Sequence, residues 1–125
     1  SPQVLEERVR THPLVAQCIV VGNDRPYISA LVTLDPDAVS HWLLMREKPD
    51  LPATELVRDP DLETEVRRAV VAANTQVSQA ESIRTFRILA AQFTEEAGFV
   101  TPSLKLKRQA VENAYATEIE ALYHR

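Results

Sequence analysis

Residues 15–34 read VAQCIVVGNDRPYISALVTL, two apolar and β-branched arms that flank the polar segment Gly22–Pro26. Glycine, asparagine, aspartate and proline favour tight turns, so the two arms should pair as a β-hairpin. In the second arm, every second residue from Ile28 to Leu34 is apolar, whereas the residues between them are more polar. This period of two is typical of a sheet that is covered on one face, and we expect helices on that face.

Sequence patterns that mark the start of a helix occur before and after the hairpin. A capping side chain followed by proline marks a helix start, and this pair occurs at Ser1–Pro2, Asp35–Pro36 and Asp59–Pro60. The third helix is the clearest, because its apolar residues recur every three or four positions, at Leu62, Val66, Val70, Ala73 and Val77. We predict helices over residues 2–12, 36–45 and 60–80, with Pro49 and Pro52 breaking the chain between the last two.

The C-terminal third combines a short strand, a loop and a helix. Residues 83–89 are β-compatible, residues 92–98 form a connector that ends at a glycine, and an apolar helical stripe covers residues 111–122. The element order is therefore helix, two strands, two helices, strand, loop and helix. This order predicts an α+β fold in which a small antiparallel sheet of about three strands is flanked by helices.

Composition excludes several classes of function. The chain has 125 residues, enough for one domain over residues 1–125, and its net charge of -4 gives no bulk attraction to nucleic acid or an anionic membrane. Its two glycines, Gly22 and Gly98, stand too far apart for a phosphate-binding glycine loop. The chain has one cysteine, no segment that resembles a signal peptide and no apolar run of about 18 residues, the length of a membrane span. We therefore expect a cytoplasmic protein.

The lysines are concentrated near the C-terminus. Of the three lysines in the chain, Lys105 and Lys107 fall within the stretch LKLKR of residues 104–108. If this stretch is extended, the two lysines lie on one side, and Leu104 and Leu106 anchor the other. An ammonium on a flexible stem can reach into a pocket and stabilise negative charge on a carboxylate or phosphate oxygen. Short basic clusters are more often solvated surface, so the residues alone leave both interpretations open.

A resemblance to a known family rests on two parts of the chain. Residues 95–98 (EEAG) and 101–108 (TPSLKLKR) look like the C-terminal lysine motif of the acyl-activating, adenylate-forming enzymes, in the form carried by long-chain fatty-acid CoA ligases. Near the start, residues 2–6 (PQVLE) and 12–15 (HPLV), followed by VVG and RPY, resemble the segment that opens the small C-terminal domain of these enzymes. Many relatives have glycine where this chain has Leu104. The leucine fits the long-chain branch better than it fits acetyl-CoA synthetases or peptide-synthetase adenylation domains.

The resemblance implies that the chain is the mobile C-terminal lid of a long-chain fatty-acid CoA ligase. Fatty acid and ATP would give an acyl-adenylate and pyrophosphate, and the thiol of CoA would then displace AMP. Lys105 is implied to be the catalytic lysine that bridges the carboxylate and the nucleotide, or Lys107 if the alignment shifts by two residues. ATP and Mg²⁺ would be bound mainly by a large N-terminal domain absent from this chain, and the hinge would lie upstream of Ser1.

Several other residues are weaker candidates. Lys107 and Arg108 are candidates for contacts with phosphate or CoA, although a surface charge and a salt-bridging residue are the simpler interpretation. The Gly22–Pro26 turn is a further candidate for a CoA contact, beside its simpler role as a hairpin turn. We predict no metal site, because the histidines and Cys18 lack ligand spacing, and we expect Cys18 and Trp42 to be core residues.

Two non-enzymatic interpretations compete with the ligase. A single-stranded RNA-binding module needs aromatic residues on an open sheet face and a basic surround, but only Tyr27 is aromatic within the hairpin arms. A non-enzymatic α+β binding or dimerisation module is the alternative that the sequence leaves open. For the ligase, the partners are its own N-terminal domain, a long-chain fatty acid, ATP and CoA, with no nucleic acid. Peripheral membrane contact of the full-length enzyme stays open, and the chain alone should be inactive.

Overall fold

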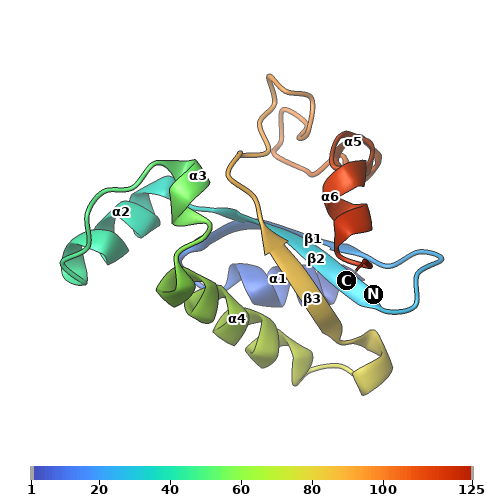
Figure 1. Ribbon diagram of the computed structural model, residues 1–125. Coiled ribbons are helices and arrows are strands. Elements are labelled where there is room, and N and C mark those ends of the chain that lie inside the picture. The colour runs from blue at the N-terminus through green and yellow to red at the C-terminus, as the bar shows by residue number, and fades with distance from the viewer. Residues whose placement is uncertain (1, 125) are drawn as a thin grey trace.

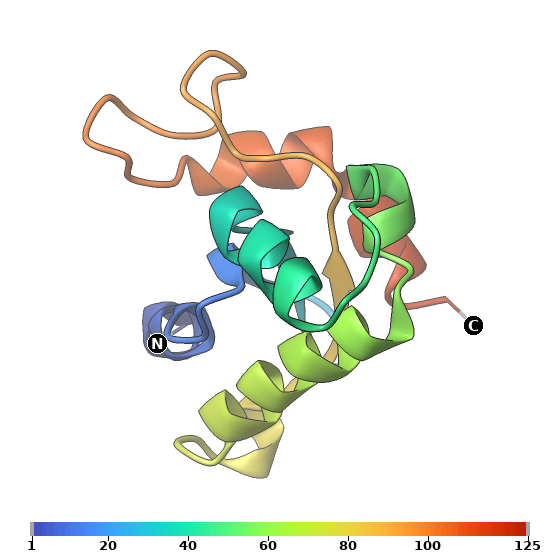
Figure 2. The same cartoon turned by 90° about the vertical axis from the view of Figure 1, so that its left-hand side faces the viewer.

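The computed structural model describes residues 2–124, in which a three-stranded sheet carries helices on both faces (Figure 1 and Figure 2). Strands β1 (Val15–Val21) and β2 (Ile28–Leu34) form the predicted antiparallel hairpin. Strand β3 (Ile83–Ile88) pairs with the other side of β2, which gives the strand order β1-β2-β3. The prediction of a small three-stranded sheet flanked by helices is therefore confirmed.

The direction of β3 corrects the prediction that the whole sheet is antiparallel. β3 runs parallel to β2, with Ala30 opposite Phe86, so the sheet is mixed. A parallel neighbour needs a long crossover connection, usually helical. Here the crossover contains three helices: α2 (Pro36–Met45), α3 (Ala53–Leu56) and α4 (Pro60–Asn74). Helix α4 carries the chain back along the sheet before β3 starts, which fixes the direction of that strand (Figure 1).

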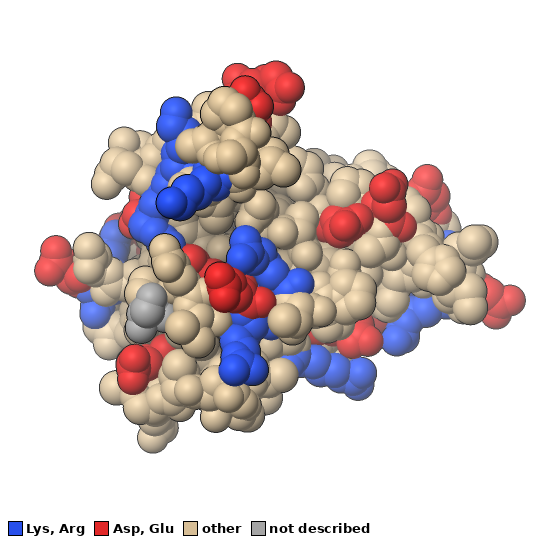
Figure 3. Space-filling model, turned by 180° about the vertical axis from the view of Figure 1, so that it is seen from behind, with Lys and Arg blue, Asp and Glu red and all other residues tan. Residues whose placement is uncertain are grey.

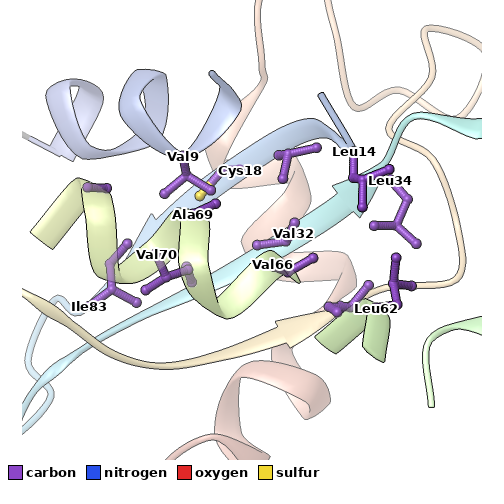
Figure 4. Close-up of a cluster of buried hydrophobic side chains, with 14 of the residues drawn as sticks. Val9, Leu14, Cys18, Val32, Leu34, Leu62, Val66, Ala69, Val70 and Ile83 are labelled. Atoms are coloured by element: carbon purple, nitrogen blue, oxygen red, sulfur yellow. The ribbon is translucent and has the colours of Figure 1, made fainter. Parts of the chain in front are cut away.

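The first face of the sheet is covered by α1 (Pro2–Arg10) and α4. The predicted caps of α2 and α4 are present, because the side chains of Asp35 and Asp59 each accept a backbone N–H from the first helical turn at 3.0 Å. Ser1, the expected cap of α1, lies outside the described residues. The side chains packed between these helices and the sheet include Val9, Cys18, Val32, Leu62, Val66 and Val70 (Figure 4).

Helix α4 is shorter than predicted, because it ends at Asn74 rather than near Ala80. The side-chain amide of Asn74 donates to Ile83 O at 2.9 Å and accepts from Ile83 N at 2.8 Å. These two bonds hold the helix end beside the first residue of β3. The apolar stripe continues past the helix end, since Val77 still packs against the core before the short 3₁₀ helix η1 (Gln79–Glu81).

The second face of the sheet is also covered, contrary to the expectation from the alternating pattern. Ile19 and Leu31 are fully buried there, against α5 (Arg108–Ala114) and α6 (Ala116–Ala121). These two helices replace the single last helix that was predicted, and they meet at Tyr115. The C-terminal segment therefore forms a second layer over the sheet.

Buried hydroxyl groups explain why this face looked polar in the sequence. Ser29 and Thr33 have no exposed surface. The hydroxyl of Ser29 lies 3.0 Å from that of Thr85, and the hydroxyl of Thr33 accepts from Gln17 N at 3.1 Å. Because each hydroxyl has a partner inside the fold, a polar residue in these positions does not indicate contact with water.

Cys18 and Trp42 are packing residues, as predicted. Cys18 has no exposed surface, and burial raises the pKa of its thiol to about 12, so the thiol stays protonated. Trp42 of α2 is partly buried against the core of the first face, and the guanidinium of Arg46 lies over its ring at 5.0 Å.

Replacing Val66 by alanine should lower the free energy of unfolding by about 2 kcal/mol, because the side chain is fully buried and its loss leaves a cavity. The matched control is Val71→Ala in the same helix, where the side chain is 58% exposed. That change should cost less than about 0.5 kcal/mol. Urea denaturation followed by circular dichroism measures both variants, and equal losses would contradict the packing of α4 against the sheet.

Candidate functional site

The chain leaves the sheet after β3 and forms a projecting loop over residues 90–107 (Figure 1 and Figure 2). Hydrogen bonds to β2 fix its start: the amide of Leu89 donates to Val32 O at 2.8 Å, and the side chain of Gln92 donates to the last carbonyl of β2 at 2.6 Å. Further along, Gly98 turns the chain with a φ of +83°, a conformation that glycine adopts without strain. The loop is therefore an ordered extension of the sheet.

The last part of this loop is a small hairpin over residues 99–107, which we call the lysine hairpin. Val100 and Leu106 form an antiparallel bridge across it, and both pack against the core of the second face. Thr101 N donates to Lys105 O at 2.8 Å, and the hydroxyl of Thr101 accepts from Lys105 N at 3.0 Å. The backbone of Lys105 is thus held by one threonine on the opposite arm, while the arms rest on apolar side chains.

Leu104 departs from the predicted alternation. In an extended stretch it would lie on the anchoring side together with Leu106, but Leu104 is 70% exposed. Its φ is +64°, in the left-handed region, because the chain reverses direction at this residue. The reversal breaks the period of two, so the alternation holds for Leu106 only. A non-glycine residue in this conformation costs about 1–2 kcal/mol.

Lys105, the predicted catalytic residue, is exposed on the lysine hairpin. Within residues 2–124, the carboxylates that form salt bridges pair with other cations and not with Lys105. Lys48, by contrast, is held by both Asp59 and Asp61 at 3.0 and 2.8 Å. Figure 3 shows basic side chains along one flank of the projecting loop at the top of the molecule. The ammonium of Lys105 can therefore serve an anion that comes from outside this domain.

Three aromatic rings hold the base of the lysine hairpin to the C-terminal helices. The ring centroids of Phe93 and Phe99 lie 5.7 Å apart, and each lies 5.8 Å from the ring of Tyr115. Tilted and edge-to-face contacts at these separations are favourable for aromatic pairs. Burial among these side chains raises the pKa of Tyr115. The cluster joins the two sides of the projecting loop to the junction between α5 and α6.

An ion pair between Glu6 and Arg108 fixes the other end of the lysine hairpin. The Nη2 atom of Arg108 donates to both carboxylate oxygens of Glu6 at 2.8 Å, and Nη1 donates to Val20 O at 3.0 Å. The same carboxylate accepts from Val20 N at 2.7 Å. Glu6 is only 6% exposed, so these hydrogen-bond donors take the place of water around its carboxylate. The pair joins α1, the edge of β1 and the first residue of α5.

Arg108 therefore has the salt-bridging role that was the simpler interpretation of this residue. Its side chain is still 38% exposed and lines a cavity of about 320 Å³ together with Leu5 and Glu112. Lys107 is exposed beside it, and contacts of Lys107 and Arg108 with phosphate or CoA stay predictions. The role of Glu6 was not predicted, because nothing in a single helical glutamate indicates a partner 102 residues away.

The Gly22–Pro26 turn is tied to the end of the chain. Arg25 donates to Glu120 at 3.1 Å, and its guanidinium lowers the pKa of that carboxyl to about 2. The hydroxyl of Tyr27 donates to the backbone just after α6 at 2.8 Å, and the hydroxyl of Tyr123 donates to Tyr27 O at 3.0 Å. The turn thus has a structural role in this domain, and its contact with CoA stays a prediction.

Between Pro2 and His124, no three histidine, cysteine, aspartate or glutamate side chains gather closely enough to hold a metal ion. No helix in that range combines the length and the hydropathy needed to cross a bilayer. The lysine hairpin exposes two positively charged side chains, Lys105 and Lys107.

The chain is similar to a known protein family and to known proteins over all or almost all of its length. All of residues 1–125 match the family model of the AMP-binding enzyme C-terminal domain. The chain belongs to this family. The C-terminal domain described here is 46% identical over 126 residues to the long-chain-fatty-acid–CoA ligase FadD15 of Mycobacterium tuberculosis, covering all of the chain and 21% of that protein. It is 32% identical to the putative fatty-acid–CoA ligase fadD11 of the same species, covering 98% of the chain and 22% of that protein.

Solved structures give the same fold for this C-terminal domain. The A-PCP didomain of carboxylic acid reductase from Segniliparus rugosus, in complex with AMP, matches 98% of the chain and 16% of that structure, with a TM-score of 0.72 and 25% identity. The adenylation domain of a carboxylate reductase from Mycobacterium chelonae matches 97% of the chain and 17% of that structure, with a TM-score of 0.73 and 26% identity. The resemblance inferred from the lysine motif is confirmed, and the chain spans about a fifth of the length of its curated relatives.

The ion pair of the C-terminal domain can be tested by the change Arg108→Ala. It should lower the free energy of unfolding by about 2–3 kcal/mol, because the carboxylate of Glu6 would be left buried without its cation. The matched control is Lys107→Ala, an exposed cation one residue earlier, which should cost less than about 0.5 kcal/mol. Chemical denaturation measures both, and a similar cost for the two variants would count against a structural role for the pair.

Proposed function

We propose that this chain acts as the mobile C-terminal domain of a long-chain fatty-acid CoA ligase and that Lys105 supplies positive charge for acyl-adenylate formation. The observation that carries the proposal is the exposed ammonium of Lys105, unpaired within residues 2–124, on a hydrogen-bonded hairpin that projects from the domain. The 46% identity to a long-chain-fatty-acid–CoA ligase supports this class of substrate.

In the first half-reaction, an oxygen of the fatty-acid carboxylate attacks the α-phosphorus of ATP. The new oxygen–phosphorus bond forms as the bond to pyrophosphate breaks, which leaves an acyl-adenylate. Two anionic groups must come together in this step, so a cation held between them lowers the barrier by positioning and by neutralising charge. ATP and its Mg²⁺ would be bound mainly by the large N-terminal domain, and this chain would deliver Lys105 to them.

In the second half-reaction, the thiol of CoA loses its proton and attacks the acyl carbonyl, and AMP leaves. The C-terminal domain would turn about a hinge upstream of Ser1 between the two steps and present another face. This movement would withdraw Lys105, which the second step does not need. Contacts of Lys107, Arg108 and the Gly22–Pro26 turn with phosphate or CoA would belong to one of these two arrangements.

Other functions have less support. Two structural neighbours are carboxylic acid reductases, but their identity of 25–26% is well below that of the ligase. An RNA-binding sheet needs an open face, whereas side chains of the described residues cover both faces here. The chain belongs to a domain family of enzymes, which makes a purely non-enzymatic binding or dimerisation module the weaker interpretation. The cytoplasmic location and the peripheral membrane contact of the whole enzyme stay predictions.

The change Lys105→Ala in the full-length enzyme should lower the rate of acyl-adenylate formation by about 10²- to 10³-fold, as the loss of one preorganised electrostatic group does elsewhere. Thioester formation from preformed acyl-adenylate should stay close to the unmutated rate. Pyrophosphate exchange and single-turnover thioester formation measure the two steps separately. Lys107→Ala is the matched control, and a loss in that variant alone would move the role to Lys107. Equal losses of both half-reactions in Lys105→Ala would contradict the proposal.

The 125-residue chain alone should form no acyl-adenylate from ATP, Mg²⁺ and palmitate. A single exposed lysine has no bound substrates to position, and the groups that would hold ATP belong to the other domain. Incubation with radiolabelled ATP and separation of the nucleotides tests this directly. Turnover by the isolated chain would show that it contains a complete active site, which the proposal denies.

A further inference from the structure

Leu104 combines two unfavourable features at the tip of the lysine hairpin. Its backbone is in the left-handed region, with φ of +64°, and its apolar side chain is 70% exposed. Within residues 2–124, the other non-glycine residues with positive φ are Asp24 and Glu47, which are polar residues at turns. A glycine at position 104 would carry neither cost, because it adopts this conformation freely and has no side chain to expose.

The fold of this domain does not depend on the leucine side chain. The hairpin is closed by backbone groups, since Leu104 N donates to Thr101 O at 2.8 Å and Thr101 N donates to Lys105 O at 2.8 Å. The core of the second face includes Leu106 but not Leu104. Strained backbone that the fold does not need is characteristic of functional sites, where the cost is recovered in another state of the protein.

We propose that Leu104 is a positioning residue, which packs into an apolar surface of the large domain when Lys105 is delivered to the reacting groups. The inference rests on the proposed function. The α-carbons of Leu104 and Lys105 are about 3.8 Å apart across one peptide bond, and the hairpin around them is closed by hydrogen bonds. Anchoring the leucine would therefore fix the origin of the lysine side chain, and burial would remove the exposed apolar surface.

The position of Leu104 in the chain, and not the charge of the loop, selects the surface that it contacts. Glu95 and Glu96 are exposed on the same projecting loop, and Figure 3 shows acidic side chains at the outer end of that loop. Lys105 and Lys107 are exposed on this loop as well, so its charges have both signs and do not distinguish a protein surface from an anionic bilayer. Leu104 is the chain neighbour of Lys105, which the proposed function places against substrates held by the large domain, so the large domain is the occupant that we propose.

The test compares three substitutions in the full-length enzyme: Leu104→Gly, Leu104→Asn and Leu104→Met. Asparagine tolerates the left-handed conformation but is polar, whereas methionine keeps the apolar volume. Acyl-adenylate formation should fall about tenfold in the glycine and asparagine variants, the effect of losing burial of one leucine, and should stay near normal in the methionine variant. Thioester formation from preformed acyl-adenylate should not change in any of them.

Thermal unfolding of the 125-residue chain distinguishes a positioning role from a structural one. If Leu104 only supported the fold, its replacement by glycine would lower the unfolding midpoint. The midpoint of Leu104→Gly should stay equal to that of the unmutated chain or rise, although adenylation falls, because the substitution relieves backbone strain. A fall in both stability and adenylation would instead indicate that the leucine supports the fold, and it would overturn the inference.

The remaining outcomes separate this inference from the proposed function. If Lys105→Ala abolishes adenylation but the glycine and asparagine variants of Leu104 do not, the proposed function stands and the inference is wrong. A loss in Leu104→Gly alone would assign the effect to backbone flexibility and would also overturn it. If Leu104→Asn loses binding to phosphatidylglycerol vesicles while pyrophosphate exchange stays normal, the leucine contacts lipid instead. Normal adenylation by Lys105→Ala would overturn both proposals.

Discussion

The carboxylate of Glu6 is the group on which the arrangement of this domain depends. It is almost fully buried, and it accepts hydrogen bonds from Arg108 at 2.8 Å and from Val20 N at 2.7 Å. Val20 lies on the edge strand of the sheet, where its backbone groups would otherwise lack partners within the sheet. One ion pair therefore satisfies a buried charge, closes part of a sheet edge and fastens the C-terminal helices to the N-terminal helix.

This ion pair also explains how an exposed lysine can have a defined position. The lysine hairpin is held at one end by Arg108 and along its base by the rings of Phe93, Phe99 and Tyr115. Only its tip lies beyond these anchors. A charged group supports catalysis when its position is set before the substrates arrive. The domain thus restricts the backbone at position 105 and leaves the long side chain free to reach another surface.

The sequence predicted what is decided locally. The hairpin turn, the aspartate caps and the apolar stripe of α4 all follow from residues a few positions apart, whereas the role that the lysine motif assigns to Lys105 stays a prediction. The parallel direction of β3 and the covered second face depend on contacts between distant segments, and the early end of α4 depends on the hydrogen bonds between Asn74 and Ile83 at the start of the next strand. Glu6 carried no local signal at all. Leu104 could not be placed, because the alternation that predicts an extended stretch fails where the chain reverses.

The two kinds of cation in the motif, lysine and arginine, differ in what their chemistry allows. A guanidinium is planar and presents its donors in fixed directions, so Arg108 can serve a carboxylate and a backbone carbonyl at once inside the fold. An ammonium is a compact charge on a flexible stem, which suits Lys105 for the role that we propose, where the anion comes from outside this domain. Exchanging the two residue types would place a rigid group where reach is needed and a flexible one where geometry must be fixed. In this short stretch, arginine therefore attaches the hairpin to the fold, and lysine carries the function that we propose for it.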